Sequence, residues 1–343
     1  MRPCEPDPHS SHCDPCAAMD YKSEWKEFLE KISVLQWMLT FLFMGVSFLL
    51  LLVYLMFTSL WVVPVLYFTW IVLDWDTPER GGRPSAWVRG WAVWKHFRDY
   101  CPITLVKTAE LSPGRHYVLG SHPHGIMCLG VFCCFGTNAA GFPHLFPGLR
   151  PHLATLAGLF RLPVYREYLM TSGMCPVSKK SLQYLLSQPG GGNAVVIVVG
   201  GAAESLTCRP GLHSLVIRDR KGFVRLALQY GAALVPVYSF GENDVFEQVL
   251  LEEGSLGRWL QGMVRRVLGF APCLFKGGTW GFLPYRTPIT IVVGSPIPVP
   301  KLFCPPQETV DHYHQLYIEA LEKLFHAHKT QCGLRPTDQL QII

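Results

Sequence analysis

The sequence has little charge. Asp, Glu, Lys and Arg make up 16% of its 343 residues, whereas about 25% is usual for soluble domains. Disordered chains are rich in charge and poor in aromatic side chains, so this composition, with 13% aromatic residues, excludes that class. The glycines and prolines follow no repeating period, which excludes a collagen-like fibre. The net charge of +5 is too small and too dispersed to indicate a nucleic-acid partner.

Several enzyme motifs are also missing. The sequence has no GxSxG nucleophile elbow and no P-loop lysine motif, which argues against a covalent serine hydrolase and an NTPase. It lacks GxGxxG, so a Rossmann dinucleotide site is not indicated. One CxxC motif, Cys13–Cys16, has no second CxxC to complete a zinc site. We therefore expect no metal, and we interpret the twelve cysteines as free thiols in a reducing cytosol.

A run of 42 residues, 32–73, contains no charged side chain. The core of a signal peptide has only about 7–15 residues, and one straight helix of this length would measure roughly 63 Å, about twice the hydrocarbon thickness of a bilayer. We therefore expect two spans or one deep helical hairpin, with helices at about Val34–Phe57 and Leu60–Leu73. A buried helix pair in a soluble protein would carry more polar residues. Basic residues flank the run on both sides, which predicts that both of its ends face the cytosol.

Beyond Asp76 short β-rich runs alternate with helical ones. This alternation predicts an α/β fold with parallel strand pairings. The expected strands are His116–Ser121, Ala194–Val199, Leu234–Ser239 and Ile289–Val293, and the expected helices are 178–188, Gly222–Tyr230 and an amphipathic segment near 310–325.

Two histidines follow the first of these strands in the string Ser121-His122-Pro123-His124-Gly125. Open α/β sheets bind ligands at the carboxyl ends of their strands, and a neutral imidazole is the side chain best matched to a general base near pH 7. His122 and His124 are therefore candidate catalytic bases. Two alternatives stay open: a metal pair, for which no third ligand is identifiable, and a turn histidine bonded to the backbone.

A glycine pair, Gly200 and Gly201, follows the strand at Ala194–Val199. Such a pair at a strand end can present backbone N–H groups to an oxyanion or a phosphate. Glu204, shortly after, could orient a histidine or a substrate hydroxyl, or could be an ordinary carboxylate at the start of a helix.

Basic side chains collect at Arg218–Arg225, near a predicted helix N-terminus, where anions are favoured. A phosphate-rich ligand such as coenzyme A would fit there, and the alternative is a solvated basic surface. The strand at Leu234–Ser239 ends in a polar segment that contains Glu242 and Asn243.

Taken together, these strings resemble the diacylglycerol acyltransferase 2 family, which includes monoacylglycerol and wax-alcohol acyltransferases. The resemblance covers about Val34 to the C-terminus. The residues that carry it are His122–Gly125, Leu145–Gly148, Val199–Gly201 with Glu204, Arg220–Arg225, Val235-Pro236 and Phe240–Asn243.

The resemblance implies an acyl-CoA-dependent O-acyltransferase of triacylglycerol and neutral-lipid synthesis, with an acylglycerol or a fatty alcohol as acceptor and acyl-CoA as co-substrate. It implies a multi-pass protein of the endoplasmic reticulum membrane whose active site faces the cytosol, and some members also reach lipid droplets. The implied fold is a glycerolipid-acyltransferase-like mixed sheet flanked by helices, with an N-terminal two-helix membrane hairpin. We expect a cytosolic segment at 1–31, disordered over 1–18, a transmembrane hairpin at 32–75 and an acyltransferase domain at 76–343. Membrane lipid is an expected partner, and a homo-oligomer is compatible with the family.

The family also suggests roles for individual residues. His124 is favoured over His122 as the base, because plant relatives keep Pro-His but replace the first histidine. The wider superfamily has an Asp five positions after its His, but here that position is Leu129, so Glu204 becomes the candidate orienter by analogy. The expected substrate-binding residues are Gly125, Gly200 and Gly201 for the oxyanion, Arg220, Lys221 and Arg225 for CoA phosphates, and Glu242 and Asn243.

One segment departs from the family. Phe275–Gly281 is much shorter than in relatives and lacks their Arg. This difference supports an alternative hypothesis, a catalytically inactive paralogue that binds lipid or a partner.

Overall fold

The computed structural model describes residues 23–252, 254–268 and 272–343, so the expected disorder of residues 1–18 lies outside the described chain. The described residues build a seven-stranded sheet in the order β1-β10-β7-β2-β5-β3-β4. Its neighbours pair in parallel except for β10 and β7, which are antiparallel. The predicted mixed α/β architecture is confirmed. The strands are β1 Ile103–Lys107, β2 Tyr117–His122, β3 Arg150–Thr155, β4 Met174–Pro176, β5 Asn193–Val198, β7 Ala233–Phe240 and β10 Ile289–Val293.

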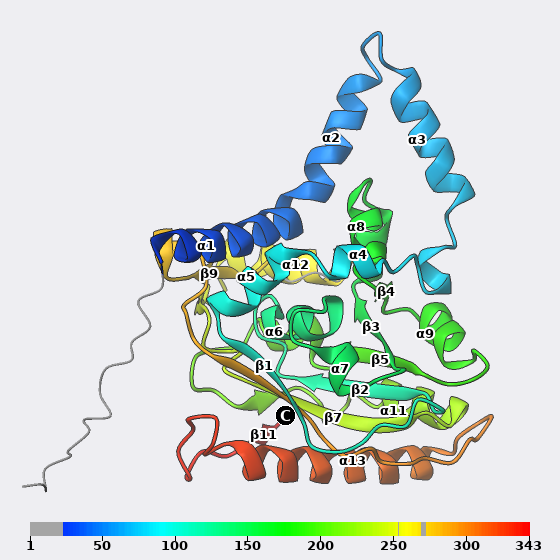
Figure 1. The fold of residues 1–343 in the computed structure, drawn as a ribbon, viewed down its shortest axis with the longest axis vertical. Coiled ribbons are helices and arrows are strands. Elements are labelled where there is room, and N and C mark those ends of the chain that lie inside the picture. The colour runs from blue at the N-terminus through cyan, green and yellow to red at the C-terminus, as the bar shows by residue number, and fades with distance from the viewer. Residues whose placement is uncertain (1–22, 253, 269–271) are drawn as a thin grey trace, which may run out of the picture.

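Helices cover both faces of this sheet (Figure 1). The strands β2 and β7 are buried along their whole length, as expected for central parallel strands that are covered on both faces. One core lies between the sheet and the helices α1, α5 and α8, and the other lies between the sheet and α9, α11 and α13. The bounds of these helices are α1 Glu24–Leu39, α5 Ala92–Tyr100, α8 Tyr165–Thr171, α9 Lys179–Leu186, α11 Gly222–Tyr230 and α13 Gln307–His328.

Further helices and strands lie around this sheet and its covering helices. They are the α-helices α4 Ala86–Arg89, α6 Leu129–Val131, α7 Phe142–Leu145, α10 Gly201–Ser205 and α12 Leu256–Leu268; the π-helices η1 Thr40–Met44 and η3 Phe132–Gly136; the 3₁₀-helices η2 Pro78–Arg80, η4 Ala157–Arg161 and η5 Thr279–Gly281; and the strands β6 Ser214–Leu215, β8 Glu247–Val249, β9 Leu274–Lys276 and β11 Gln341–Ile342. Strand β6 pairs with β11, and β8 pairs with β9.

The apolar N-terminal run divides into two parts at a π-helical turn. Helix α1 continues through η1 into α2 (Gly45–Leu55), and after a turn α3 (Val62–Leu73) runs back toward the domain. Single π-turns often mark kinks in helices, and here α1 lies along the domain whereas α2 and α3 project from it (Figure 1).

Of the two expected membrane-spanning helices, only the first corresponds to a helix with the length and apolar composition of a span. Among the described residues, one helix, Glu24–Leu55, is long and apolar enough to cross a membrane. Helix α3 has 12 residues and is about 18 Å long, against roughly 30 Å for the hydrocarbon core. The start of the first expected span also differs, because Val34, Trp37 and Met38 are buried against the domain. The ring centroid of Trp37 lies 5.3 Å from that of Phe97. An apolar run does not distinguish burial in protein from burial in lipid, which is why the sequence placed this boundary too early.

Candidate active site

The two motif histidines have different surroundings. His122 ends β2 and is fully buried, with its Nε2 3.1 Å from the hydroxyl of Tyr317 on α13. That hydroxyl donates its proton to the carbonyl oxygen of Gly120, at 2.8 Å, so Nε2 of His122 must carry the proton and donate to Tyr317. Burial lowers the pKa of His122 to about 3, so the ring is neutral at physiological pH. His122 therefore ties β2 to α13.

His124 lies at a cavity, and its tautomer suits a base. Nδ1 is 3.0 Å from the carbonyl oxygen of Gly125, a contact that requires the proton on Nδ1 and leaves the lone pair on Nε2. Burial lowers the pKa of His124, while the contact with Gly125 opposes that shift. The ring is thus neutral near pH 7 and can accept a proton at Nε2.

Glu204 on α10 holds the main chain of His124. Its Oε1 accepts the backbone N–H of His124 at 2.6 Å, and its Oε2 accepts the backbone N–H of Val216 at 2.8 Å. Burial raises the pKa of Glu204, and these two bonds oppose the rise. The predicted orienter therefore positions the turn that carries His124, and no bond joins the carboxylate to the imidazole ring.

The glycine before α10 is needed for space. A Cβ at Gly200 would lie 2.2 Å from Oε2 of Glu204, so a larger residue would push the carboxylate out of its position. Gly201 has a positive φ of 57°, a conformation that glycine adopts at little cost.

A cavity of about 660 Å³ begins at these residues. His124, Gly200, Gly201 and Arg220 contribute to its polar part. The rest is largely apolar, and its lining includes Trp37, Phe41, Phe132, Leu159, Tyr168 and Leu169. The volume corresponds to roughly twenty groups the size of a water molecule, at about 30 Å³ each, which is about the size of one long acyl chain. It lies within the range usual for small-molecule sites.

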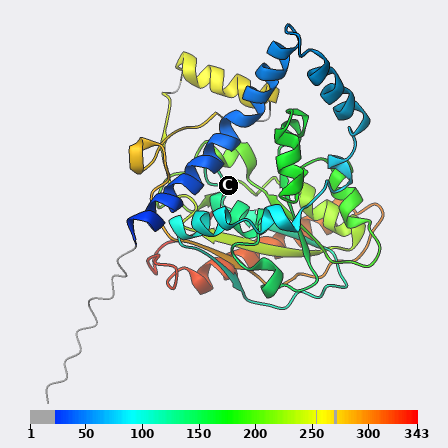
Figure 2. The same cartoon turned by 45° about the horizontal axis from the view of Figure 1, so that its top comes forward.

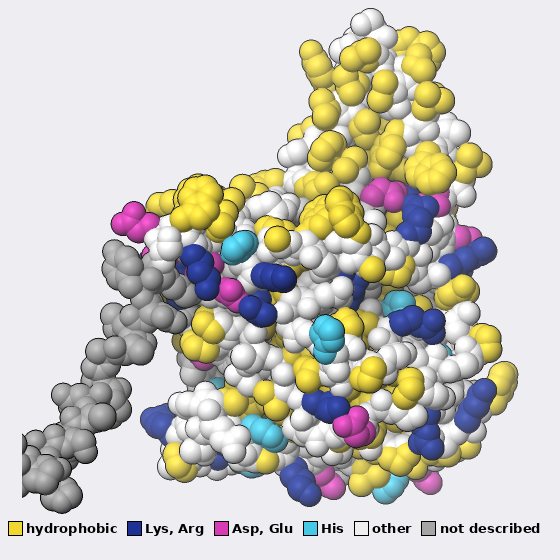
Figure 3. Space-filling view, in the orientation of Figure 1, with side chains coloured by type: hydrophobic (Ala, Val, Ile, Leu, Met, Phe, Trp, Pro, Cys, Tyr) yellow, Lys and Arg dark blue, Asp and Glu magenta, His cyan; other side chains and the backbone are white. Residues whose placement is uncertain are grey.

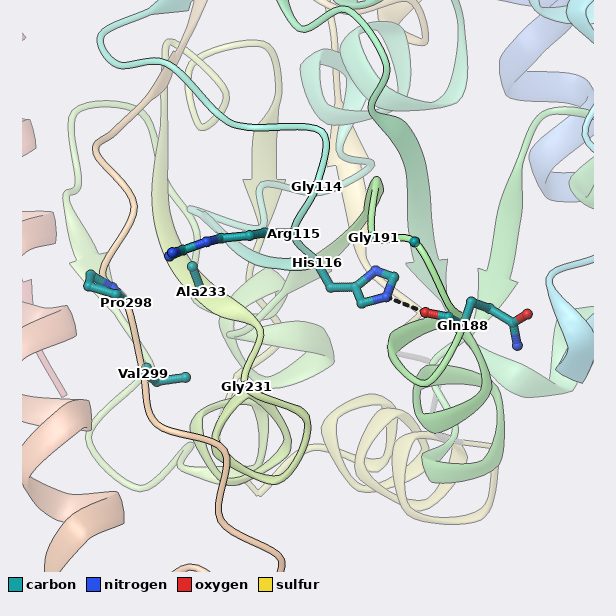
Figure 4. Close-up of a pocket in the computed structure, with 10 residues that line it drawn as sticks. Gly114, Arg115, His116, Gln188, Gly191, Gly231, Ala233, Pro298 and Val299 are labelled. Atoms are coloured by element: carbon teal, nitrogen blue, oxygen red, sulfur yellow. Dashed lines mark hydrogen bonds between the residues drawn. The ribbon is translucent and has the colours of Figure 1, made fainter.

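A second hollow, of about 430 Å³, lies at the opposite end of β2 (Figure 4). Arg115, His116, Gly191 and Val299 are among its lining residues, and the ring of His116 contacts the carbonyl oxygen of Gln188 at 2.8 Å. It contains none of the predicted site residues, so we place the candidate active site at His124.

The structure separates the three cations expected to bind CoA. Arg220 lines the cavity. Lys221 instead forms an ion pair with Asp311 on α13, with 2.8 Å between Nζ and Oδ1. Arg225 donates to the carbonyl oxygen of Pro305 and to the side chain of Gln307. Lys221 and Arg225 thus join α11 to the start of α13, which leaves Arg220 as the cation of this trio at the cavity.

Glu242 and Asn243 lie outside the cavity lining. Oε2 of Glu242 accepts the backbone N–H of Gly130 at 3.0 Å, and a Cβ at Gly125 would lie 2.8 Å from Cγ of Glu242. Burial raises the pKa of Glu242 to about 7. Asn243 donates its side-chain amide to the carbonyl oxygen of Leu212. Glu242 and Asn243 therefore hold the backbone around Gly125 and after β7 in place. Neither residue is positioned to make the substrate contact that the sequence suggested.

The segment that departs from the family is also absent from the cavity lining. Within Phe275–Gly281, Phe275 and Lys276 belong to β9, which pairs with β8, and no residue of this segment lines the cavity. The cavity lining therefore gives no support to the inactive-paralogue hypothesis, which rests on the shortened segment alone.

Sequence reasoning missed Tyr317 and the aromatic cavity lining. Tyr317 lies in the amphipathic segment predicted near 310–325, for which the sequence indicated no role in the site. The i, i+4 spacing of Trp37 and Phe41 marks one helical face, but that face was assigned to the membrane.

Comparisons with known proteins agree with the motifs. The family model described as diacylglycerol acyltransferase matches residues 53–343. The chain is 56% identical to diacylglycerol O-acyltransferase 2 of Xenopus tropicalis, over 94% of this chain and 91% of that protein. The human protein of that name is also 56% identical, over 94% and 84%. Human 2-acylglycerol O-acyltransferase 3 is 55% identical, over 94% and 96%.

Among solved structures, the 1-acyl-sn-glycerophosphate acyltransferase of Thermotoga maritima aligns over 88% of this chain and 97% of its own, with a TM-score of 0.38 and 11% identity. That likeness is too distant to carry an argument. The family model and the sequence relatives confirm the resemblance predicted from the motifs, and the chain belongs to the diacylglycerol acyltransferase family.

Proposed function

We propose that this protein is an acyl-CoA-dependent O-acyltransferase of neutral-lipid synthesis, with a mono- or diacylglycerol or a long-chain alcohol as acceptor. One observation carries the proposal: a neutral His124, with its Nδ1 proton held by Gly125, lies at the polar part of an apolar cavity of acyl-chain size. The names and identities of the relatives support the reaction class.

In the proposed mechanism His124 takes the proton of the acceptor hydroxyl at Nε2 while the oxygen attacks the thioester carbonyl. Backbone N–H groups near Gly125, Gly200 and Gly201 stabilise the resulting oxyanion. Gly201 opens α10, so its N–H has no acceptor within that helix. Collapse of the intermediate forms the ester and breaks the C–S bond, and the departing CoA thiolate takes the proton back from the imidazolium. Arg220 contributes a donor for a CoA phosphate.

We place the protein in the endoplasmic reticulum membrane, with α2 and α3 inserted from the cytosolic side and the catalytic domain in the cytosol. The basic flanks of the apolar run support this orientation. Helix α2 has 11 residues and is about 17 Å long, so the projecting pair reaches about half of the hydrocarbon core. Such a hairpin is also compatible with the monolayer of a lipid droplet.

The test is acyl transfer in microsomes from cells that lack endogenous neutral-lipid synthesis. Labelled oleoyl-CoA is offered with monoacylglycerol, diacylglycerol or hexadecanol. We expect product with at least one acceptor, and a loss of about 10²–10⁴-fold in kcat for His124→Ala. His312→Ala, at an exposed position of α13, is the matched control. Turnover near the wild-type rate in His124→Ala removes the residue from the mechanism, and no product from well-expressed wild-type protein contradicts the proposed function.

A further inference from the structure

Helix α12 turns its apolar stripe outward. Leu256, Trp259, Leu260 and Met263 follow the i, i+3, i+4, i+7 spacing of one helical face, and all four are exposed, Leu256 at 72% and Trp259 at 62%. A helix on a globular domain ordinarily turns such a stripe to the core. Here the buried side contains Gln261 instead, whose side-chain amide donates to the carbonyl oxygen of Pro272 at 2.8 Å.

Helix α1 also has an exposed apolar stripe. Trp25, Phe28 and Ile32 lie at i, i+3 and i+7 and are exposed, Trp25 at 65%, whereas Trp37 and Val34 are buried against the domain. The rings of Trp25 and Phe28 stack with centroids 5.6 Å apart. Two helices that are far apart in the sequence therefore each expose an aromatic and aliphatic stripe.

Both helices lie on the side of the domain from which the hairpin projects (Figure 1). Figure 2 shows α12 beside the bend between α1 and α2, and Figure 3 shows hydrophobic side chains that extend from the hairpin onto neighbouring parts of the domain. Trp87 in α4 and Trp280 in η5 also have exposed indole rings. Tryptophan is enriched where proteins meet the interface of a bilayer.

We propose that α12 and the exposed stripe of α1 lie in the headgroup region of the phospholipid leaflet that holds the hairpin, as a second membrane contact. Two observations favour lipid over a second copy of the chain. The stripe of α1 leads along one continuous helix into the exposed apolar surface of α2, beside which α12 lies (Figure 2). In addition, α12 carries Arg258 and the exposed Arg266, which suit phosphate headgroups.

This contact has a consequence for the cavity. Trp37 and Phe41, which line it, belong to the same continuous helix as the exposed stripe of α1. If α2 and the exposed stripe of α1 both contact lipid, the end of the cavity that is lined by Trp37 and Phe41 is held against the leaflet. A lipid acceptor could then enter the cavity directly from the leaflet, without crossing water. The inference concerns membrane geometry and does not depend on the chemistry proposed for His124.

The test uses the full chain in phosphatidylcholine–phosphatidylserine vesicles that contain a clickable phospholipid. A photoreactive benzophenone amino acid replaces Trp259 in one variant and Met263, one turn on, in a second. Leu66 on α3 is the positive control. Phe303, 99% exposed in the loop before α13 on the opposite side of the domain, is the negative control. We expect lipid adducts at positions 259 and 263 at a level similar to position 66 and severalfold above position 303.

Two results would overturn the inference. Lipid adducts at position 66 alone would show that the hairpin inserts while α12 stays in water, and the proposed membrane location would survive. Adducts between two protein chains at positions 259 and 263, in place of lipid adducts, would show that a second copy covers this surface. Because the replaced side chains are exposed, the variants should fold like the wild type, and thermal unfolding in detergent verifies this.

Discussion

Oxygen Oε1 of Glu204 lies 2.6 Å from the backbone nitrogen of His124, a residue 80 positions away in the sequence. The other oxygen accepts the backbone N–H of Val216. One buried carboxylate thus joins three separate segments: the turn after β2, helix α10 and the chain after β6. The imidazole of His124 is oriented by its own Nδ1 contact with Gly125, so Glu204 controls where the ring sits rather than its tautomer.

The loss caused by a substitution at Glu204 should depend on how many hydrogen-bond acceptors the new side chain keeps. Glu204→Ala leaves two buried N–H groups without an acceptor, at about 1–3 kcal/mol each. Glu204→Gln keeps one carbonyl oxygen and should lose less. We expect both stability and kcat to fall in the order wild type, Gln, Ala, and thermal unfolding in detergent together with acyl transfer measures this. If both variants kept the wild-type kcat, the carboxylate would have no part in positioning His124.

Tyr317 gives a test of the structural role assigned to His122. Tyr317→Phe removes the hydroxyl between His122 and Gly120, which leaves the buried Nε2–H of His122 without its acceptor and takes one donor from the Gly120 carbonyl oxygen. We expect a loss of about 1–3 kcal/mol in the free energy of unfolding, with the acyl-CoA KM unchanged, because Tyr317 does not line the cavity. A large rise in KM without loss of stability would instead place the His122–Tyr317 pair in the substrate site.

The sequence predicted the elements that depend on local pattern. The expected strand at Leu234–Ser239 corresponds to β7, and the expected helix at Gly222–Tyr230 matches α11 and ends at Gly231 with a positive φ. It could not predict partners that lie far apart in the chain. Tyr317 is 195 positions from His122, and no local pattern connects the two.

For a related reason, the sequence could not show which partner each charged or apolar side chain contacts. A basic cluster records that cations are present but not which partner each one takes, so Arg220 could not be told apart from Lys221, which pairs with Asp311. An apolar run likewise does not reveal whether lipid or protein covers it, and Trp37 proved to be buried against the domain.

Glu242 should make stability depend on pH. Burial raises its pKa from 4.5 to about 7 in the folded state, so between these values the folded chain keeps a proton that the unfolded chain has lost. Stability therefore falls as pH rises through this window, by roughly 3 kcal/mol in full. Glu242→Gln removes the titration and can still accept the N–H of Gly130.

The measurement compares the Tm of wild type and Glu242→Gln in detergent from pH 4.5 upward. Buried histidines such as His122 titrate with the opposite sign, but they are present in both proteins and cancel in the difference. We expect the wild type to lose stability relative to the variant as pH approaches 7. A difference in Tm that stays constant with pH would contradict the raised pKa.

Arg220 and Arg225 form a matched pair for locating CoA, since they belong to the same basic cluster but contact different parts of the protein. Arg220 lines the cavity, and removal of its charge should raise the acyl-CoA KM by about threefold to tenfold, or roughly 0.7–1.4 kcal/mol. Arg225 contacts Pro305 and Gln307, so Arg225→Ala should cost up to about 1 kcal/mol of stability and leave KM unchanged.

Because an exposed cation is screened by salt, the effect of Arg220→Ala on the acyl-CoA KM should shrink as ionic strength rises. Equal KM increases in both variants would show that the whole cluster binds CoA, as the sequence alone suggested, and that the contacts of Arg225 with the loop before α13 give way when the ligand is bound.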